Sequence, residues 1–102
     1  MTEAELQATV IEAAKWLNYA VYHTYDSRRS APGFPDLVLT NRATGHTLFR
    51  EIKTEKGKLT AAQRQWLHYL GMRHDAGVWR PADWTSGRVL AELRGTAPAV
   101  TA

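Results

Sequence analysis

Apolar residues recur along this chain with two different periods, and the changes of period divide it into predicted helices and strands. Near the start, five apolar residues repeat at the spacing of a helix face, namely Leu6, Val10, Ala13, Ala14 and Leu17. Thr2 and Glu5 form a capping-box pattern at the beginning of this run. The pattern predicts a helix from Glu3 to about Leu17, which Asn18 ends.

The centre of the chain predicts a β-hairpin. Residues 33–53 read GFPDLVLTNRATGHTLFREIK, so a loop rich in Gly and Pro leads into an apolar run, and a turn containing Gly leads into a second run. We expect residues 36–39 to pair with residues 48–51, which places the start of the first strand beside the end of the second. Residues 20–24 are rich in β-forming side chains and predict another strand beside this hairpin.

A second capping-box pattern, Thr60 with Gln63, opens a further predicted helix. Its apolar face consists of Trp66, Leu67 and Leu70. Gly71 is the expected C-terminal cap of this helix. Residues 54–59, which precede the helix, are predicted to form a flexible basic connection.

The last two elements complete an α/β pattern. Residues 76–80 predict a short strand closed by Pro81, which cannot donate to a ladder, and residues 85–93 predict a helix that ends at Gly95. The order helix, three strands, helix, strand, helix predicts a mixed central sheet flanked by helices. The four tryptophans are expected in the core or at its rim, with base stacking by one of them as the alternative: Trp16, Trp66, Trp79 and Trp84.

Length and composition restrict the function. With 102 residues the chain suits one domain, expected to span residues 1–95, and residues 96–102 are expected to be a disordered tail. The absence of cysteine excludes disulfides and thiolate metal sites. Neither an HxxxH motif, a serine elbow nor a Gly-rich phosphate loop is present, so the sequence gives no support to a zinc hydrolase, an acyl-transfer triad or nucleotide-triphosphate chemistry. With no apolar run long enough for a bilayer, we expect a soluble cytoplasmic protein without a membrane partner.

The formal net charge of +3 is modest, but the charges are unevenly placed. The segment from position 42 to 64 contains six basic residues but only two acidic ones. The basic residues are Arg42, Arg50, Lys53, Lys56, Lys58 and Arg64, and the acidic residues are Glu51 and Glu55. This local positive field would suit a polyanion such as DNA. The candidate DNA contacts are Lys56, Lys58 and Arg64, with Arg28 and Arg29 from the polar loop before the hairpin. An ordinary solvated basic surface is the alternative interpretation.

The hairpin also carries the candidate chemistry. Alternate strand residues project from the same face, so Glu51 and Lys53 share a surface, and the expected pairing brings Asp36 to it. Two carboxylates with a lysine suit a hard divalent cation beside a phosphate. Asp36, Glu51 and the backbone carbonyl of Ile52 are the candidate metal ligands, and Lys53 is the candidate residue to orient or activate an attacking water. The alternative is a surface Glu-Lys pair with a turn aspartate.

Two further polar residues have both a structural and a functional interpretation. Glu3 lies at the edge of the apolar stripe of the first helix, where its carboxylate could reach the sheet, whereas Glu5 is used in the cap; a first-turn Glu is also favoured by the helix dipole alone. Gln63 is either the capping partner of Thr60 or a polar contact near the active centre. The sequence pattern by itself favours the cap for Gln63.

These residues resemble a known family. Gly33-Phe34-Pro35-Asp36 followed by Glu51-Ile52-Lys53 resembles the signature of PD-(D/E)xK nucleases, which have a restriction-endonuclease-like αβββαβ core. The sequel from Gly57 to Trp66, GKLTAAQRQW, resembles the VRR-NUC branch of that superfamily. The similarity extends from the first helix through the strand at residues 76–80.

The resemblance implies a nuclease that depends on Mg²⁺ or Mn²⁺. The family's roles fall on Asp36 and Glu51 as metal ligands, on Lys53 as the catalytic lysine, and on Glu3 and Gln63 as the helical acid and the glutamine. Small members of this kind resemble phage, bacterial and archaeal-type resolvases that act as homodimers on branched DNA. The leading hypothesis is therefore a structure-specific DNA endonuclease of a bacterium or phage-infected cell, with a Holliday-junction resolvase as the main candidate.

Three alternatives remain open at this stage. The protein could be a nicking or flap nuclease, a catalytically weak DNA-binding module, or a subunit that needs a partner protein. For a homodimer, the large side chains of Trp66, Tyr69 and Trp84 are candidates for the subunit interface.

Overall fold

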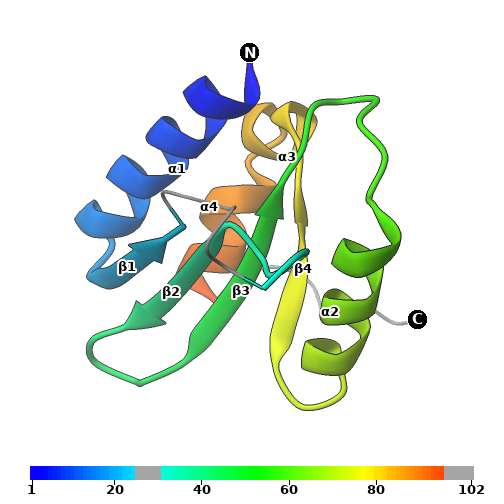
Figure 1. The fold of residues 1–102 in the computed structure, drawn as a ribbon. Coiled ribbons are helices and arrows are strands. Elements are labelled where there is room, and N and C mark those ends of the chain that lie inside the picture. Colours follow the sequence, from blue (N-terminus) through cyan, green and yellow to red (C-terminus); the bar gives the residue numbers. More distant parts are fainter. Residues whose placement is uncertain (25–30, 96–102) are drawn as a thin grey trace.

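The computed structural model of the protein describes residues 1–24 and 31–95 and shows an α/β fold (Figure 1). Its elements, in chain order, are α1 (Glu3–Trp16), β1 (Tyr19–His23), β2 (Leu37–Asn41), β3 (Thr47–Ile52), α2 (Ala61–Gly71), β4 (Asp75–Trp79), α3 (Pro81–Thr85) and α4 (Arg88–Arg94). The expected order is confirmed, with α3 as an additional short helix. Two predictions, the DNA-contacting role of Arg28 and Arg29 and the disordered tail 96–102, fall outside the described residues.

The four strands form one mixed sheet in the order β1-β2-β3-β4. β1 with β2 and β2 with β3 are antiparallel, and β4 joins β3 in parallel after the α2 crossover. Leu37 pairs with Arg50 and Leu39 with Leu48, which is the register expected for the hairpin. This register sets the ends of β2 and β3 that carry the signature residues side by side.

The hydrophobic core lies between one face of this sheet and helices α1 and α4. Its fully buried members come from α1, the sheet and α4: Leu6, Val10, Ala14, Leu37, Leu39, Leu48, Trp79 and Val89. On the opposite face, Phe49 contacts Phe34 with ring centroids 6.3 Å apart, and Phe34 contacts Trp66 of α2 at 5.1 Å. Helix α2 and the loop before β2 therefore cover the face from which Glu51 projects.

Both capping boxes form as the sequence indicates. The side chain of Thr2 accepts from the N–H of Glu5, and that of Thr60 accepts from the N–H of Gln63. The predicted cap at Gly71 is wrong, because this glycine is the last residue of α2 and Met72 caps the helix.

The C-terminal part differs from the prediction in one element. Pro81 begins the short helix α3, and Gly87, with a φ of 84°, separates it from α4, so the last helix starts at Arg88 and not at residue 85. Gly95 adopts the left-handed conformation expected of a C-terminal cap. Trp16, expected in the core or at its rim, is 83% exposed.

Arg50 lies inside the molecule and does not contribute to the basic surface that the sequence suggested. Its Nη2 lies 2.8 Å from a carboxylate oxygen of Asp75 in β4 and 2.9 Å from one of Glu92 in α4. The guanidinium also lies 4.9 Å from the centre of the Trp79 ring. These contacts pair the buried charge and tie β3 to β4 and α4.

None of the helices in the described part of the chain is long and apolar enough to span a membrane.

Candidate active site

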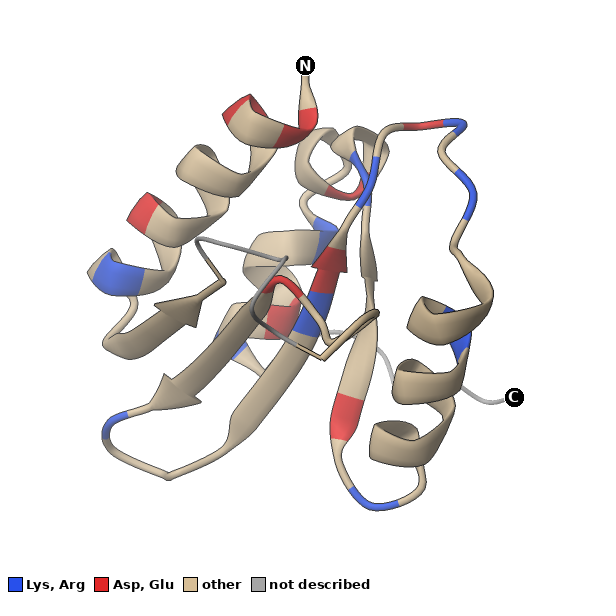
Figure 2. Cartoon of the chain, in the orientation of Figure 1, with Lys and Arg blue, Asp and Glu red and all other residues tan. Residues whose placement is uncertain are grey.

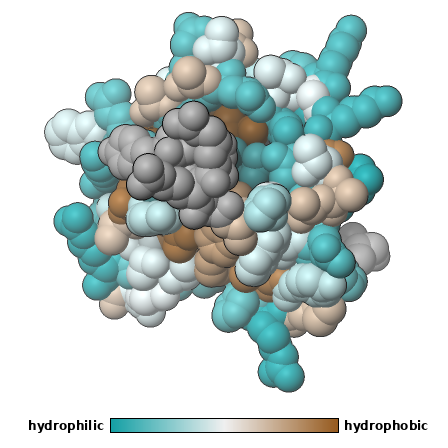
Figure 3. Space-filling view, viewed as in Figure 1, coloured by the Kyte–Doolittle hydropathy of each residue, from teal (hydrophilic) through white to brown (hydrophobic). Residues whose placement is uncertain are grey.

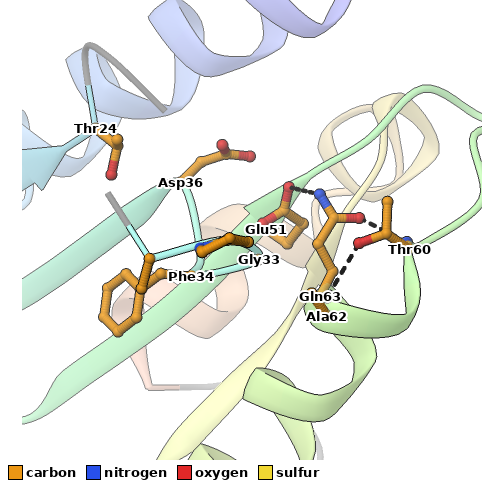
Figure 4. Close-up of a pocket in the computed structure, with 10 residues that line it drawn as sticks. Thr24, Gly33, Phe34, Asp36, Glu51, Thr60, Ala62 and Gln63 are labelled. Atoms are coloured by element: carbon orange, nitrogen blue, oxygen red, sulfur yellow. Dashed lines mark hydrogen bonds between the residues drawn. The ribbon is translucent and has the colours of Figure 1, made fainter. Parts of the chain in front are cut away.

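Three of the predicted site residues, Asp36, Glu51 and Gln63, line a pocket of about 500 Å³ on the α2 side of the sheet (Figure 4). The loop before β2 contributes Gly33 and Asp36, β3 contributes Glu51, and the start of α2 contributes Thr60 and Gln63. Elements far apart in the sequence thus bring two carboxyl groups to one hollow.

Asp36 is held in place by both neighbouring strands. Its backbone carbonyl accepts the N–H of Thr24 at 3.2 Å, and its Oδ2 accepts the N–H of Ile52 at 2.8 Å. The side chain of Asp36 therefore takes the place of a strand residue opposite Ile52. This bond orients the carboxylate toward the end of β3, beside Glu51.

Glu51 is almost buried, with 4% of its surface exposed. Burial, reinforced by the hydrogen bond and charge of the neighbouring Asp36 carboxyl, raises the pKa of Glu51 to about 8, whereas the charge of Lys53 acts in the opposite direction. Two acidic groups thus share a site in which the pair is costly to ionise without a cation.

Gln63 makes both a capping contact and a contact with a candidate site residue, which the sequence presented as alternatives. Its Oε1 accepts the N–H of Thr60 at 2.9 Å and completes the helix cap, while its Nε2 donates to Oε1 of Glu51 at 3.1 Å (Figure 4). The first turn of α2 is therefore connected directly to the acidic pair.

Lys53 follows directly after β3 and keeps the strand's alternation, because its N–H donates to the carbonyl of Trp79 at 3.1 Å. Its side chain accordingly lies on the same face as that of Glu51, whose pKa its charge lowers. Asp36 and Glu51 line the same pocket, and the site role predicted for Lys53 beside them stays a prediction.

Glu3 is not brought into this group. It lies exposed in the first turn of α1, and across the described residues no set of three or more His, Cys, Asp or Glu side chains is arranged to hold a metal ion. Its proposed role as the helical acid stays a prediction.

The candidate DNA contacts that the structure describes lie on the connection between β3 and α2 and in the first part of α2. Lys56 and Lys58 are exposed on the connection between β3 and α2, which Figure 2 shows as a segment with several charged residues. Arg64 is exposed as well, but its Nη1 donates to the carbonyl of Leu59 at 2.9 Å. Arg64 therefore has a structural contact in addition to any role in binding.

The connection that the sequence predicted to be flexible is instead held by several contacts. Nη1 of Arg80 donates to the carbonyls of Thr54 and Gly57, and the carboxylate of Glu55 accepts the N–H of Ala82 in α3. No sequence pattern indicated a role for Arg80. Its position between the last strand and Pro81 was the one available signal.

Gly33 is a second residue whose importance the sequence did not reveal. Its φ is 84°, and a Cβ at this position would lie 2.4 Å from the backbone carbonyl carbon of Ala62. The loop that carries Asp36 can approach the first turn of α2 this closely because residue 33 has no side chain.

The donor set suits a hard divalent cation. Two carboxyl groups converge in a largely buried place, which is costly for two negative charges and favourable for a cation between them. In a strand, the N–H and C=O of one residue face the same neighbour, so the Ile52 carbonyl lies on the side of Asp36, which accepts the Ile52 N–H. Asp36, Glu51 and this carbonyl together fit the oxygen ligands that Mg²⁺ and Mn²⁺ prefer.

The chain is similar to a known protein family and to solved structures. A family model described as the VRR-NUC domain matches residues 2–80. A solved structure described as a VRR_NUC domain protein aligns with a TM-score of 0.62 at 20% identity, covering 91% of this chain and 90% of that one. A Holliday junction resolvase, Hjc of Archaeoglobus fulgidus, aligns with a TM-score of 0.47 at 23% identity, covering 78% of this chain and 65% of that one. No curated protein matches the sequence.

Proposed function

The chain belongs to the VRR-NUC family of nucleases, and from this premise we propose that it is a metal-dependent, structure-specific DNA endonuclease. The family match runs from α1 to the end of β4 and so includes every residue that lines the pocket. We propose branched DNA as the substrate, with the four-way junction as the leading candidate.

One observation supports this proposal most strongly, namely the convergence of Asp36 and Glu51. The Ile52 N–H holds one carboxyl group and the Gln63 amide holds the other, so neither is a solvated surface acid. Such a constrained, partly desolvated acidic pair with a lysine on the same face suits phosphodiester hydrolysis better than a purely structural role.

The residues divide the chemistry between them. Asp36, Glu51 and the Ile52 carbonyl would hold Mg²⁺ or Mn²⁺, which when bound supplies charge neutralisation at the phosphoryl oxygens and lowers the pKa of a coordinated water. Lys53 offsets charge on the scissile phosphate and orients the attacking water. Gln63 keeps Glu51 in one orientation, and Glu3 is the proposed helical acid of the site.

The proposal includes a homodimer. One chain offers one pair of carboxylates at this pocket, whereas resolving a four-way junction requires two symmetric cuts, so a two-fold pair of chains is the simplest solution. Of the three interface candidates, Trp84 packs against the core and Trp66 contacts Phe34, while Tyr69 is 54% exposed on α2. Tyr69 therefore remains the best candidate for a subunit contact.

A cleavage assay over several DNA structures tests the proposal. Labelled single strand, duplex, flap, fork and four-way junction would each be incubated with Mg²⁺, with Mn²⁺ and with EDTA. We expect cleavage that requires a divalent ion and that is fastest on the four-way junction, with paired symmetric cuts. Preferential single cuts in flaps or duplexes by a monomer would favour the nicking or flap alternative, and binding without cleavage would contradict an enzyme.

A further inference from the structure

The connection between β3 and α2, residues 54–60, has no regular secondary structure, yet one side chain anchors much of it. Nη1 of Arg80, at the end of β4, donates to the carbonyls of Thr54 at 2.5 Å, Glu55 at 3.3 Å and Gly57 at 2.8 Å. Three backbone acceptors of an otherwise irregular segment thus converge on one guanidinium. Charge-assisted bonds of this kind are stronger than those between neutral groups.

Helix α3 supports this anchor from the other side. The carboxylate of Asp83 accepts the backbone N–H of Arg80 at 2.7 Å, and the carboxylate of Glu55 accepts the N–H of Ala82. The connection is therefore fixed at Arg80 and at α3, and the short helix that the sequence did not predict acts as its support.

The anchored segment also packs closely on itself and on the catalytic lysine candidate. A Cβ at Gly57 would lie 2.7 Å from Oγ1 of Thr54 and 3.5 Å from Cδ of Lys53. At its far end, Thr60 bonds to Gln63, which in turn donates to Glu51. Both ends of the connection thus adjoin the proposed active site.

The surface of this connection is cationic and open to solvent. Lys56 and Lys58 are exposed on it, and Figure 3 shows hydrophilic side chains projecting where Figure 1 places the connection between β3 and α2. The Arg80 guanidinium, in contrast, is directed at backbone carbonyls. A binding loop that is ordered before it meets its ligand loses less conformational entropy on binding.

We propose that residues 54–59 form a preformed binding loop for the DNA backbone phosphates that flank the cleaved bond, and that Arg80 is the positioning residue that holds it. Lys56 and Lys58 make the phosphate contacts, and Arg80 acts through them without touching DNA. The inference rests on the proposed function and adds to it a defined subsite and the residue that builds it.

A double-mutant cycle on DNA binding tests this inference. Affinity of the wild type, Arg80→Ala, Lys56→Gln/Lys58→Gln and the combined variant for a fluorescent four-way junction would be measured by anisotropy in EDTA. We expect Arg80→Ala to weaken binding at least about fivefold in the wild-type background and less than about twofold once both lysines are neutral. Arg42→Ala, which removes an exposed arginine at the distant hairpin turn, is the matched control for net charge.

Two further variants separate positioning from charge. Glu55→Ala removes a negative charge from the loop, and by electrostatics alone this change would tighten DNA binding. It also removes the bond from Ala82 that holds the loop, so we expect Glu55→Ala to bind DNA more weakly than the wild type. Arg80→Lys keeps the charge but lacks the planar fork, so it should bind DNA as weakly as Arg80→Ala. These milder changes also keep the test available if Arg80→Ala does not fold. Tighter binding by Glu55→Ala, or wild-type affinity of Arg80→Lys, would overturn the inference.

Amide hydrogen exchange gives a readout that does not depend on DNA. Arg80→Ala should speed exchange across residues 54–59 while leaving β2 unchanged. Arg80→Ala could instead lower the affinity equally in the wild type and in Lys56→Gln/Lys58→Gln. If the wild type binds DNA, that result would mean that Arg80 contacts a phosphate directly. It would overturn this inference and leave the proposed function standing. A wild type that binds none of the DNA structures would overturn the proposed function and this inference together.

Discussion

Glu51 is a carboxyl group placed where a carboxylate is costly. It is nearly buried, it adjoins the carboxyl of Asp36, and an amide of Gln63 donates to it. A residue kept for stability alone would gain from being apolar at this position. The arrangement therefore gives up folding stability for a pair of carboxyl groups whose chemistry suits a cation.

The role proposed for Lys53 predicts that its substitution lowers the cleavage rate much more than the affinity for DNA. Because one lysine is a small part of a contact with many phosphates, Lys53→Ala should lower the single-turnover cleavage rate at least about 100-fold and change junction affinity less than about threefold. Lys53→Arg should also fail in cleavage, since a planar fork does not reproduce a compact ammonium. Rates and affinities measured on the same junction decide the matter, and losses of equal size in both would reduce Lys53 to a phosphate contact.

The sequence predicted one of the two contacts of Gln63 from local spacing but could not predict the other. Its cap with Thr60 is local and could be read from the spacing alone, and the structure confirms it. Its bond to Glu51 depends on where the α2 crossover returns against β3, which local spacing does not contain. Asp36, Glu51 and Lys53 were predictable because strand alternation and hairpin register determine their common face.

At the scale of the elements, the loop before β2 packs closely against the start of α2. Gly33 lies against the first turn of α2 so closely that the loop carrying Asp36 and the helix carrying Gln63 are held together. The geometry of the site depends on this contact as much as on the acidic residues themselves.

Gly33→Ala tests that contact, with Gly45→Ala as its matched control. Both glycines have positive φ, 84° and 76°, but nothing lies within 4 Å of a Cβ at Gly45. Gly45→Ala should therefore show the backbone strain alone, about 1 kcal/mol, and Gly33→Ala at least about 2 kcal/mol more. Urea unfolding measures both. Equal losses of stability would show that the loop and α2 do not need this close approach.

The elements themselves were predictable to different degrees. Helix α1, the hairpin and the start of α2 follow from periodicity and capping residues, and the structure confirms them. Helix α3 was missed because its five residues are too few to show a period, although Pro81 and Asp83 at its start are typical helix-initiating residues. The anchoring of residues 54–59 was missed because Arg80 is distant in sequence and gives no local signal.

At the scale of the whole molecule, the free energy of unfolding depends on pH through two sets of acidic residues. Their pKa values are shifted in opposite directions, so their contributions change with pH in opposite ways. Burial by itself would raise the pKa of Glu92, but hydrogen bonds from Arg88 and Trp79 and the charge of Arg50 more than offset it and lower that pKa. Burial by itself would also raise the pKa of Asp75, but the hydrogen bonds and charges of Arg50 and His46 together outweigh it and lower that pKa. The pKa of Glu51 is instead raised, from 4.5 to about 8.

These shifts predict a maximum of stability in mildly acidic, metal-free solution. Asp75 and Glu92 stabilise the fold above their ordinary pKa values, and this contribution is lost as pH falls through their lowered values. Glu51 destabilises it increasingly as pH rises from 4.5 to about 8, by at most about 1.4 kcal/mol per pH unit. Unfolding free energies should therefore fall between pH 5 and 8 in the wild type and fall much less in Glu51→Gln. Equal slopes for the two proteins would contradict the buried acidic pair.

The homodimer is the second prediction at this scale. Tyr69 and Met72 leave large apolar side chains exposed near the end of α2, at 54% and 61%. If this surface joins two chains, light scattering should give twice the mass of 11.5 kDa, and Tyr69→Lys should return the monomer. Trp16→Lys, which changes an aromatic residue with 83% exposure on α1, is the control and should leave the mass unchanged. A wild-type monomer at micromolar concentration would favour the nicking alternative.

We propose that Asp36 and Glu51 form one metal-dependent active site. Cleavage of a labelled four-way junction in Mn²⁺ tests this proposal most directly. Asp36→Asn and Glu51→Gln keep the size of each side chain and should still fold and bind DNA, because both groups lie at the pocket outside the hydrophobic core. Glu12→Gln makes the same chemical change at an exposed site on α1 and is the control. We predict that each of the first two variants loses cleavage by at least about 1,000-fold while Glu12→Gln cleaves as the wild type does. Substantial metal-dependent cleavage by either Asp36→Asn or Glu51→Gln would contradict the assignment of the active site.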